Sequence, residues 1–245
     1  MKVIDASGMH YKDLNAMIKQ LIKGNAAEIL VKNVQGQRYI GDGIGGDCKV
    51  IIEGAPGNDM AAYMDGATIV VHGNAQDGVA NTMNDGKMVI HGNTGDILGY
   101  AMRGGEVYIK GDVGYRVGIH MKEYLDKKPV IVIGGKAGAF LGEYMAGGII
   151  ILLGLNVDDT QKIVGNYCGT GMHGGVIYSR IPIDSYKLGK EVKQTQAEDG
   201  DMEIIGLYVK KFSDYFGFDY RSIMDSQFVK IYPYNHRPYG NLYAY

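Results

Sequence analysis

The stretch Lys49–Met121 states one pattern four times: KVIIEGAPGNDMAAYMDG (49–66), ATIVVHGNAQDGVANTMNDG (67–86), KMVIHGNTGDILGYAMRGG (87–105) and EVYIKGDVGYRVGIHM (106–121). In each copy a glycine follows an apolar segment, and these glycines recur every 19 residues, at Gly54, Gly73, Gly92 and Gly111. A methionine follows ten residues after each of them, at Met64, Met83, Met102 and Met121. A fixed period of this length is typical of a solenoid, in which stacked coils share one core.

The apolar residues before each glycine alternate with a period of two, as in Val50/Ile52, which predicts strands. Equivalent positions then stack about 4.8 Å apart. We therefore predict a mainly β fold, a single-stranded right-handed parallel β-helix with about 19 residues per coil. The period slips by five residues within Lys122–Pro129, and a longer insertion lies around Val157–Lys162. The side chains expected inside are Ile52, Met64, Val71, Met83, Ile90, Met102, Ile109, Met121, Ile133, Met145 and Leu152.

The segments on either side of the repeats read differently. Residues 1–35 predict an α/β cap with a helix over Tyr11–Lys23, and residues 36–180 form the β-helix. The first coil needs such a cap because an open end exposes a sheet edge. Residues 181–245 predict a C-terminal cap, with a helix over Met202–Phe216 and a strand over Phe228–Tyr232. The Tyr-rich tail that follows either wraps its own solenoid or lies on a partner, and tyrosine suits both.

Composition excludes several functional classes. The formal charge is −2, so no basic field favours nucleic acid or an anionic membrane. No run of 18 apolar residues predicts a membrane span, and the first residues do not read as a signal peptide. Cys48 and Cys168 lie far apart with no CxxC motif, which is typical of buried, reduced thiols in a cytoplasmic protein.

Gly41, Gly43 and Gly46 match GxGxxG, the dinucleotide fingerprint. A true fingerprint opens a helix whose N-terminus holds the pyrophosphate. The next segment, Cys48–Glu53, reads as a strand instead, so we interpret the glycines as a tight corner that leads into the first full coil.

Three polar ladders are the remaining candidates, because residues 19 apart stack. His72 and His91 would be neighbours in the row Glu53, His72, His91, Lys110 and could share a metal, but they lack a third ligand of the same kind. An exposed polar ladder is the simpler interpretation. Asp77 and Asp96 also stack, and paired carboxylates can act on sugars; a solvated turn is the simpler interpretation. Stacked amides in the third ladder, Asn74, Asn93 and Asp112, are usually structural. No catalytic, cofactor-binding or metal-binding residue is therefore assigned.

The sequence resembles a known family. YIGDGIGG (39–46), the 19-residue units and GNYCGTGMHGGVIY (165–178) are similar to the GXGXG domain of glutamate synthase, the C-terminal β-helix domain of its large subunit. VVHGNAQDGVANTMNDG (70–86) and GYRVGIHMKEY (114–124) resemble the stand-alone form, found where that subunit is split into separate chains. A related component of formylmethanofuran dehydrogenase shares the coils but resembles both flanks less well.

The resemblance implies a division of labour. In glutamate synthase an N-terminal cysteine frees ammonia from glutamine, and an FMN and iron–sulfur domain converts 2-oxoglutarate to glutamate. The β-helix carries no catalytic residue and braces those domains. Here position 2 is Lys2, and two distant cysteines cannot hold a cluster that needs three or four.

We therefore expect a non-catalytic structural subunit with no activity of its own. Its expected partners are glutaminase-type and FMN-dependent synthase chains, with the FMN and the iron–sulfur cluster in the partner chain. A homo-oligomer is a further expectation, and nucleic acid or membrane partners are not expected. The alternatives are a scaffold like the formylmethanofuran dehydrogenase component, or an independent carbohydrate-active β-helix.

Overall fold

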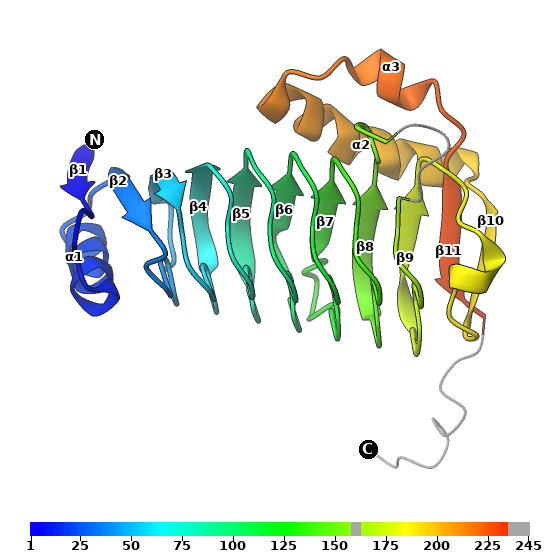
Figure 1. Ribbon diagram of the computed structural model, residues 1–245, viewed down its shortest axis with the longest axis horizontal. Helices are drawn as coiled ribbons and strands as arrows, with labels where there is room; N and C mark the ends of the chain where they lie inside the picture. The colour runs from blue at the N-terminus through cyan, green and yellow to red at the C-terminus, as the bar shows by residue number, and fades with distance from the viewer. Residues whose placement is uncertain (158–162, 235–245) are drawn as a thin grey trace, which may run out of the picture.

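The computed structural model describes residues 1–157 and 163–234, and in them the chain winds into a β-solenoid of about 6 turns (Figure 1). Eleven strands form one sheet in the order β1-β2-β3-β4-β5-β6-β7-β8-β9-β11-β10. The predicted parallel β-helix is confirmed. The strands that pair in parallel along the solenoid are β1 (Lys2–Asp5), β2 (Glu28–Gln35), β3 (Lys49–Ala55), β4 (Asp65–His72), β5 (Asp85–Ile90), β6 (Glu106–Ile109), β7 (Val130–Ile133), β8 (Ala146–Leu152) and β9 (Gly174–Ser179).

The pairing register carries the 19-residue period directly. Val50 pairs with Ile69 across β3 and β4, and Ile69 with Met88 across β4 and β5. Between β6 and β7 the offset grows, and Glu106 pairs with Val130, because the residues inserted after Met121 form a turn outside the coil. All the side chains predicted to lie inside are fully buried: Ile52, Met64, Val71, Met83, Ile90, Met102, Ile109, Met121, Ile133, Met145 and Leu152.

Close approach between coils explains the recurring glycines. A Cβ added at Gly111 would lie 2.0 Å from Asn93 Oδ1 on the previous coil. At Gly118 the backbone is left-handed (φ +71), and a Cβ would lie 2.6 Å from Ile150 Cδ1 of the second coil along. Both contacts are shorter than van der Waals distance, so a side chain at either position would push the coils apart.

The N-terminal segment closes the first end of the solenoid. Strand β1 pairs in parallel with β2 and extends the same sheet. Helix α1 (Tyr11–Lys23) has the bounds predicted from its apolar period, and its Leu14 and Ile18 are buried in the main core. This core therefore continues under the helix, and the first coil is covered.

At the other end the chain turns back. Strand β11 (Val229–Pro233) pairs antiparallel with β9, and β10 (Val192–Gln196) pairs antiparallel with β11. The short helix η1 (Ser185–Lys187) precedes them, and α2 (Asp199–Phe216) and α3 (Tyr220–Met224) lie between them. Of the Tyr-rich tail, Tyr232 belongs to β11 and the Tyr234 hydroxyl donates to the Lys190 carbonyl (3.0 Å). Residues 235–245 lie outside the described residues, as do residues 158–162 of the second insertion.

Helix α2 does not lie across the end of the last coil. It runs along the outer face of the sheet, the face turned away from the solenoid interior (Figure 1). There Ile205, Val209 and Phe212 form a second apolar cluster with Val132 and Ile151 of β7 and β8. The C-terminal segment therefore covers a flank of the solenoid as well as its end.

Polar contacts fix α2 at both ends. Near its start, Asp201 accepts from the Tyr178 hydroxyl of β9 (2.7 Å) and pairs with Lys230 of β11 (2.8 Å). Near its end, Lys211 pairs with Glu106 of β6 (2.6 Å). The helix thus runs along the outer face from β11 to β6, and its last turn reaches Lys87 of β5.

One line of side chains runs along the middle of the outer face, and we call it the central outer row. Its members are neighbours in the strand registers from β1 to β9 and all are apolar or aromatic. They are Val3, Leu30, Ile51, Val70, Val89, Tyr108, Val132, Ile151 and Tyr178.

Candidate functional site

The glycines of the GxGxxG match lie at corners of the coil before β3. Gly41, Gly43 and Gly46 have φ values of +79°, +61° and +77°. A Cβ at Gly41 would lie 2.5 Å from Ile69 Cδ1 inside the core. Strand β3 follows, in place of the helix that a dinucleotide fingerprint opens. This segment therefore lacks the helix N-terminus that would hold a pyrophosphate, and its glycines serve tight turning and packing.

The histidine ladder forms as predicted, but its surroundings differ from a simple exposed row. The rings of His72 and His91 lie 4.7 Å apart, and His91 also meets the Phe216 ring edge-on at 5.2 Å. Lys110 reaches the ring of Phe218 just beyond the helix (6.0 Å). The end of α2 and the residues after it therefore pack against this ladder.

Burial is the main reason that the pKa of His91 lies below its usual value, and the nearby His72 and Lys110 lower it further. The surroundings in the folded chain therefore favour the neutral imidazole. Among the described residues, no three His, Cys, Asp or Glu side chains form a group that could hold a metal ion. Within the row, His91 packs against the end of α2, whereas Glu53, His72 and Lys110 are exposed.

The carboxylate ladder is bonded into the backbone. Asp77 Oδ1 accepts from the N–H of Asp96 on the next coil, and Asp96 Oδ1 accepts from the N–H of Tyr115, each at 2.8 Å. One oxygen of each carboxylate therefore satisfies a backbone N–H of the next coil, which is a structural role.

The amide ladder repeats the same arrangement. Asn74 Oδ1 accepts from the N–H of Asn93, Asn93 Oδ1 from Asp112, and Asp112 Oδ1 from Lys136, each at 2.8 Å. Each side chain supplies the acceptor that a turn N–H of the following coil needs. The ladders are therefore rungs that hold successive coils together, as the sequence predicts for the amide ladder.

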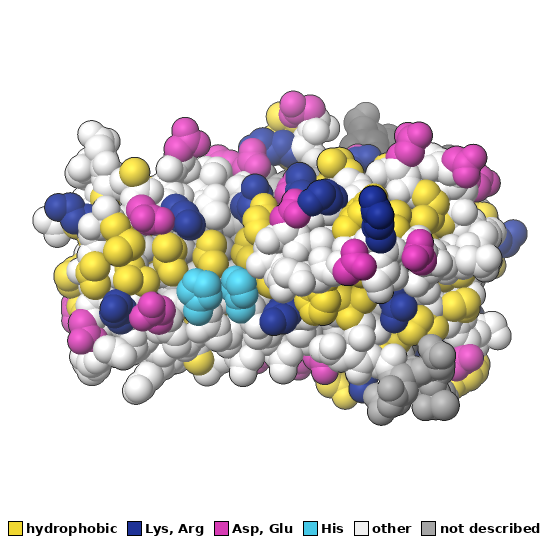
Figure 2. Space-filling model, turned by 90° about the horizontal axis from the view of Figure 1, so that it is seen from above, with side chains coloured by type: hydrophobic (Ala, Val, Ile, Leu, Met, Phe, Trp, Pro, Cys, Tyr) yellow, Lys and Arg dark blue, Asp and Glu magenta, His cyan; other side chains and the backbone are white. Residues whose placement is uncertain are grey.

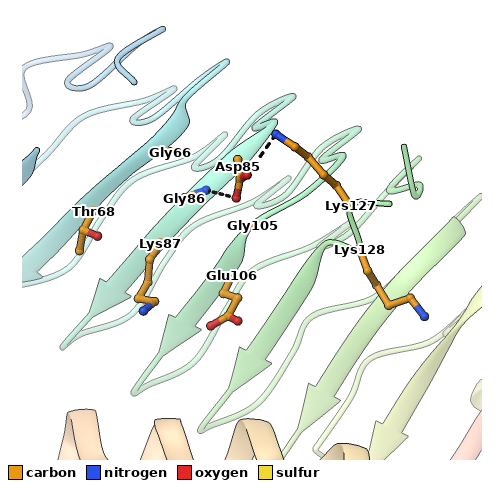
Figure 3. Close-up of a pocket in the computed structure, with 9 residues that line it drawn as sticks. All are labelled: Gly66, Thr68, Asp85, Gly86, Lys87, Gly105, Glu106, Lys127 and Lys128. Carbon is orange, nitrogen blue, oxygen red and sulfur yellow. Dashed lines mark hydrogen bonds and ion pairs between the residues drawn. The ribbon is translucent and has the colours of Figure 1, made fainter. Parts of the chain in front are cut away.

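A groove of about 380 Å³ lies at the N-terminal ends of β4, β5 and β6 (Figure 3). Its floor is the backbone of Gly66, Gly86 and Gly105, and Lys127 of the first insertion reaches over it. Lys127 Nζ lies 3.2 Å from Asp65 Oδ1 and 3.0 Å from Asp85 Oδ2. The insertion is thus tied to two earlier coils, an arrangement that the spacing of the repeats does not predict.

The other charges of the groove are also engaged. Lys128 pairs with Glu123 at 3.5 Å. Glu106 accepts from the Tyr108 hydroxyl (2.7 Å) and pairs with Lys211 of α2. Lys87 lies 5.8 Å from the centre of the Tyr215 ring. The groove combines paired charges and bare backbone, without a nucleophile held by a base.

The two cysteines are free and buried. Burial raises the pKa of Cys168 to about 12 and also raises that of Cys48. A thiol held in its protonated form is a poor nucleophile and a poor ligand. Neither cysteine therefore has the environment of a reactive thiol.

Comparison with known proteins fixes the class. A model of the family described as "GXGXG motif" matches residues 13–234, which is most of the chain. The protein therefore belongs to the GXGXG motif family, as its repeats and corner glycines indicate, and it is related to the GXGXG domain of glutamate synthase.

The chain is also similar to a protein of Methanocaldococcus jannaschii named "Uncharacterized protein MJ1350". The two are 50% identical over 250 residues, covering 99% of this chain and 96% of the relative. The similarity therefore includes both flanks as well as the coils. Among the described residues, no helix is both long and apolar enough to cross a membrane.

Proposed function

We propose that this protein is a non-catalytic structural subunit of a split glutamate synthase. In this proposal it braces a glutaminase-type chain and an FMN-dependent synthase chain that together convert glutamine and 2-oxoglutarate to glutamate. The family membership and its extent along the chain support the proposal. The FMN and the iron–sulfur cluster belong to the synthase chain, and the complex is cytoplasmic.

The ladders are the observation that carries the proposal. The side chains that most resembled catalytic groups, Asp77 and Asp96, already accept hydrogen bonds from the next coil. One oxygen of each carboxylate is thereby engaged in holding successive coils together. The residues of this solenoid are instead used to make it stiff, which suits a brace.

This use of Asp77 and Asp96 also disfavours an independent carbohydrate-active enzyme. A scaffold similar to the formylmethanofuran dehydrogenase component has no specific support in the geometry. The glutamate synthase proposal is therefore preferred over both.

Co-expression of the three chains with an affinity tag on this one tests the assembly. The expected result is a complex that contains all three chains at fixed stoichiometry and carries flavin absorbance. Purification of this chain alone, while the other two form a complex without it, would contradict the proposal. Removal of residues 235–245 in the same experiment shows whether the tail is needed for docking.

A further inference from the structure

The central outer row is buried along only part of its length. Tyr108 and Val132 of the row are fully buried, in the cluster that α2 joins. On β1 to β4 the row is less covered: Val3 is 58% exposed, and Ile51 and Val70 are half-buried, although Leu30 on β2 is buried. Figure 2 shows apolar side chains in a band on the part of this face that the helices leave open. Among the described residues, no helix lies over that part (Figure 1).

Helix α2 has a second apolar side that its own solenoid does not use. Ile204 and Leu207 are 38% and 55% exposed, whereas Ile205, Val209 and Phe212 are fully buried. Residues three apart lie on the same side of a helix, so Ile204 and Leu207 form a small apolar patch that points away from the sheet.

These two surfaces have matching dimensions. The helix layer makes a step of about 10 Å on the outer face, because that is the thickness of a helix with its side chains. The part of the outer face that no helix covers, from Val3 on β1 to Val70 on β4, spans three strand spacings, or about 14 Å. That length equals about nine residues of helix, so half of α2 covers it.

We propose that two copies of the chain pair through their outer faces, with the helix layer of each copy filling the step of the other. Ile204 and Leu207 of one copy would then cover Val3, Ile51 and Val70 of the second copy. A single two-fold rotation buries both unpartnered surfaces twice, because residue i meets residue j and j meets i. A helix from an unrelated chain would cover the row but would leave Ile204 and Leu207 exposed.

The charges around both surfaces suit such a contact. Beside the open part of the row, Glu28 and Lys49 pair with each other at 3.3 Å. On the exposed side of α2, Lys210 pairs with Asp214. Both rims therefore carry charges of mixed sign, typical of a polar rim around an apolar centre, and neither presents a field that would repel its copy.

Sedimentation analysis of the full chain over a dilution series tests the pairing. The wild-type chain should be a dimer that dissociates on dilution. Leu207→Lys and Ile51→Lys should each weaken dimerisation at least about thirtyfold, which corresponds to about 2 kcal/mol. Leu207 is mostly exposed, so its variant should keep the wild-type circular dichroism and melting in dilute solution. Tyr115→Lys, at an exposed corner 56% accessible to solvent, is the matched control and should leave the dimer intact.

Cysteine cross-linking locates the contact. Cys48 and Cys168 are buried, so mild oxidation should act on introduced thiols. A chain with both Val3→Cys and Leu207→Cys should give a covalent dimer, since β1 and α2 lie too far apart within one copy to react (Figure 1). A wild-type chain that stays monomeric would overturn the proposal, even if the chain then binds a different partner through the same face. So would a dimer that survives both lysine substitutions. The test uses this chain alone, so its outcome is separate from assembly with synthase chains.

Discussion

The two halves of the outer sheet face have the same kind of interior behind them but different surfaces. Behind both, methionines and branched aliphatics fill the solenoid without exposure. On the outside, β7 and β8 carry Val130 and Ile149 beside the central outer row, and α2 covers them. In the same register, β3 and β4 carry Lys49 and Thr68, and that half is open.

The difference shows how wide an apolar strip must be before a helix of the same chain settles on it. A surface helix buries a stripe of several residues on its inner side. On β7 and β8 the apolar strip is broad enough to receive such a stripe. On β3 and β4 it narrows to one residue between charged or polar neighbours, which suits a contact between molecules better than a permanent core.

The largest losses of stability should come from substitutions in the core, and they should be equal in the two halves because both share the same kind of interior. Met64 lies behind the open half and Met145 behind the covered half, and both side chains are fully buried. The substitutions to compare are Met64→Asp and Met145→Asp. Each substitution should cost about 4 kcal/mol, since it buries an unpaired carboxylate. Urea unfolding measures this. If one variant unfolds at the same urea concentration as the wild-type chain, that methionine does not lie in the core and the coil register is wrong there.

The same truncation on the central outer row should distinguish the halves. Val132 is fully buried beneath α2 and Val70 is half-buried in the open part. Val132→Ala should destabilise the monomer by about 2 kcal/mol, the loss of two buried methyl groups plus a small cavity. Val70→Ala, compared in dilute solution, should cost less than half as much. Equal losses would mean that the open half is covered in solution by something already bound.

Each hydrogen bond of the polar ladders should contribute a smaller amount to the free energy of unfolding, in both halves of the solenoid. Asp96→Ala leaves the N–H of Tyr115 without its acceptor and should cost about 1 kcal/mol. Asp96→Asn keeps an oxygen in the same place and should unfold at the wild-type urea concentration. A structural rung predicts this contrast. Equal loss of stability in both variants would show that the negative charge itself matters and would reopen a chemical role for this carboxylate.

The smallest predicted effect lies at the border between the halves, where His91 meets α2. Its lowered pKa means that the folded state prefers the neutral ring. Below the ordinary histidine pKa of about 6.5, the unfolded chain gains a proton that the folded chain resists. Stability from this group is therefore complete above that pH and is lost as the pH falls through the folded-state pKa. The loss of unfolding free energy between pH 7.5 and pH 5, measured by urea unfolding, should be smaller in His91→Gln than in the wild-type chain. An unchanged pH dependence would argue against the contact with Phe216.

Much of this structure follows from local sequence signals. The 19-residue period and the alternation around residues such as Ile69 and Val71 dictate strands, register and interior. The apolar period and Gly24 set the bounds of α1. These features are readable because each depends on neighbours along the chain or on a repeat of fixed length.

The position of α2 was not predicted, because it depends on surfaces distant in sequence. A signal was present: VIVI at Val130–Ile133 and IIIL at 149–152 are continuous apolar runs, the mark of strands buried on both faces. The first coils alternate more strictly with polar residues. Stacking of the polar ladders was predicted from spacing. The hydrogen bonds from Asp77 and Asp96 to the next coil depend on turn geometry, which spacing alone does not define.

The most direct test of the scaffold role is the rate of glutamine-dependent glutamate formation by reconstituted chains. We expect no activity from this chain alone. We expect a low rate from the glutaminase-type and FMN-dependent synthase chains together, and a full rate when this chain is added. Asp77→Asn and Asp96→Asn variants should support the full rate, since they preserve the rungs. A full rate from the two partner chains without this protein would contradict the account.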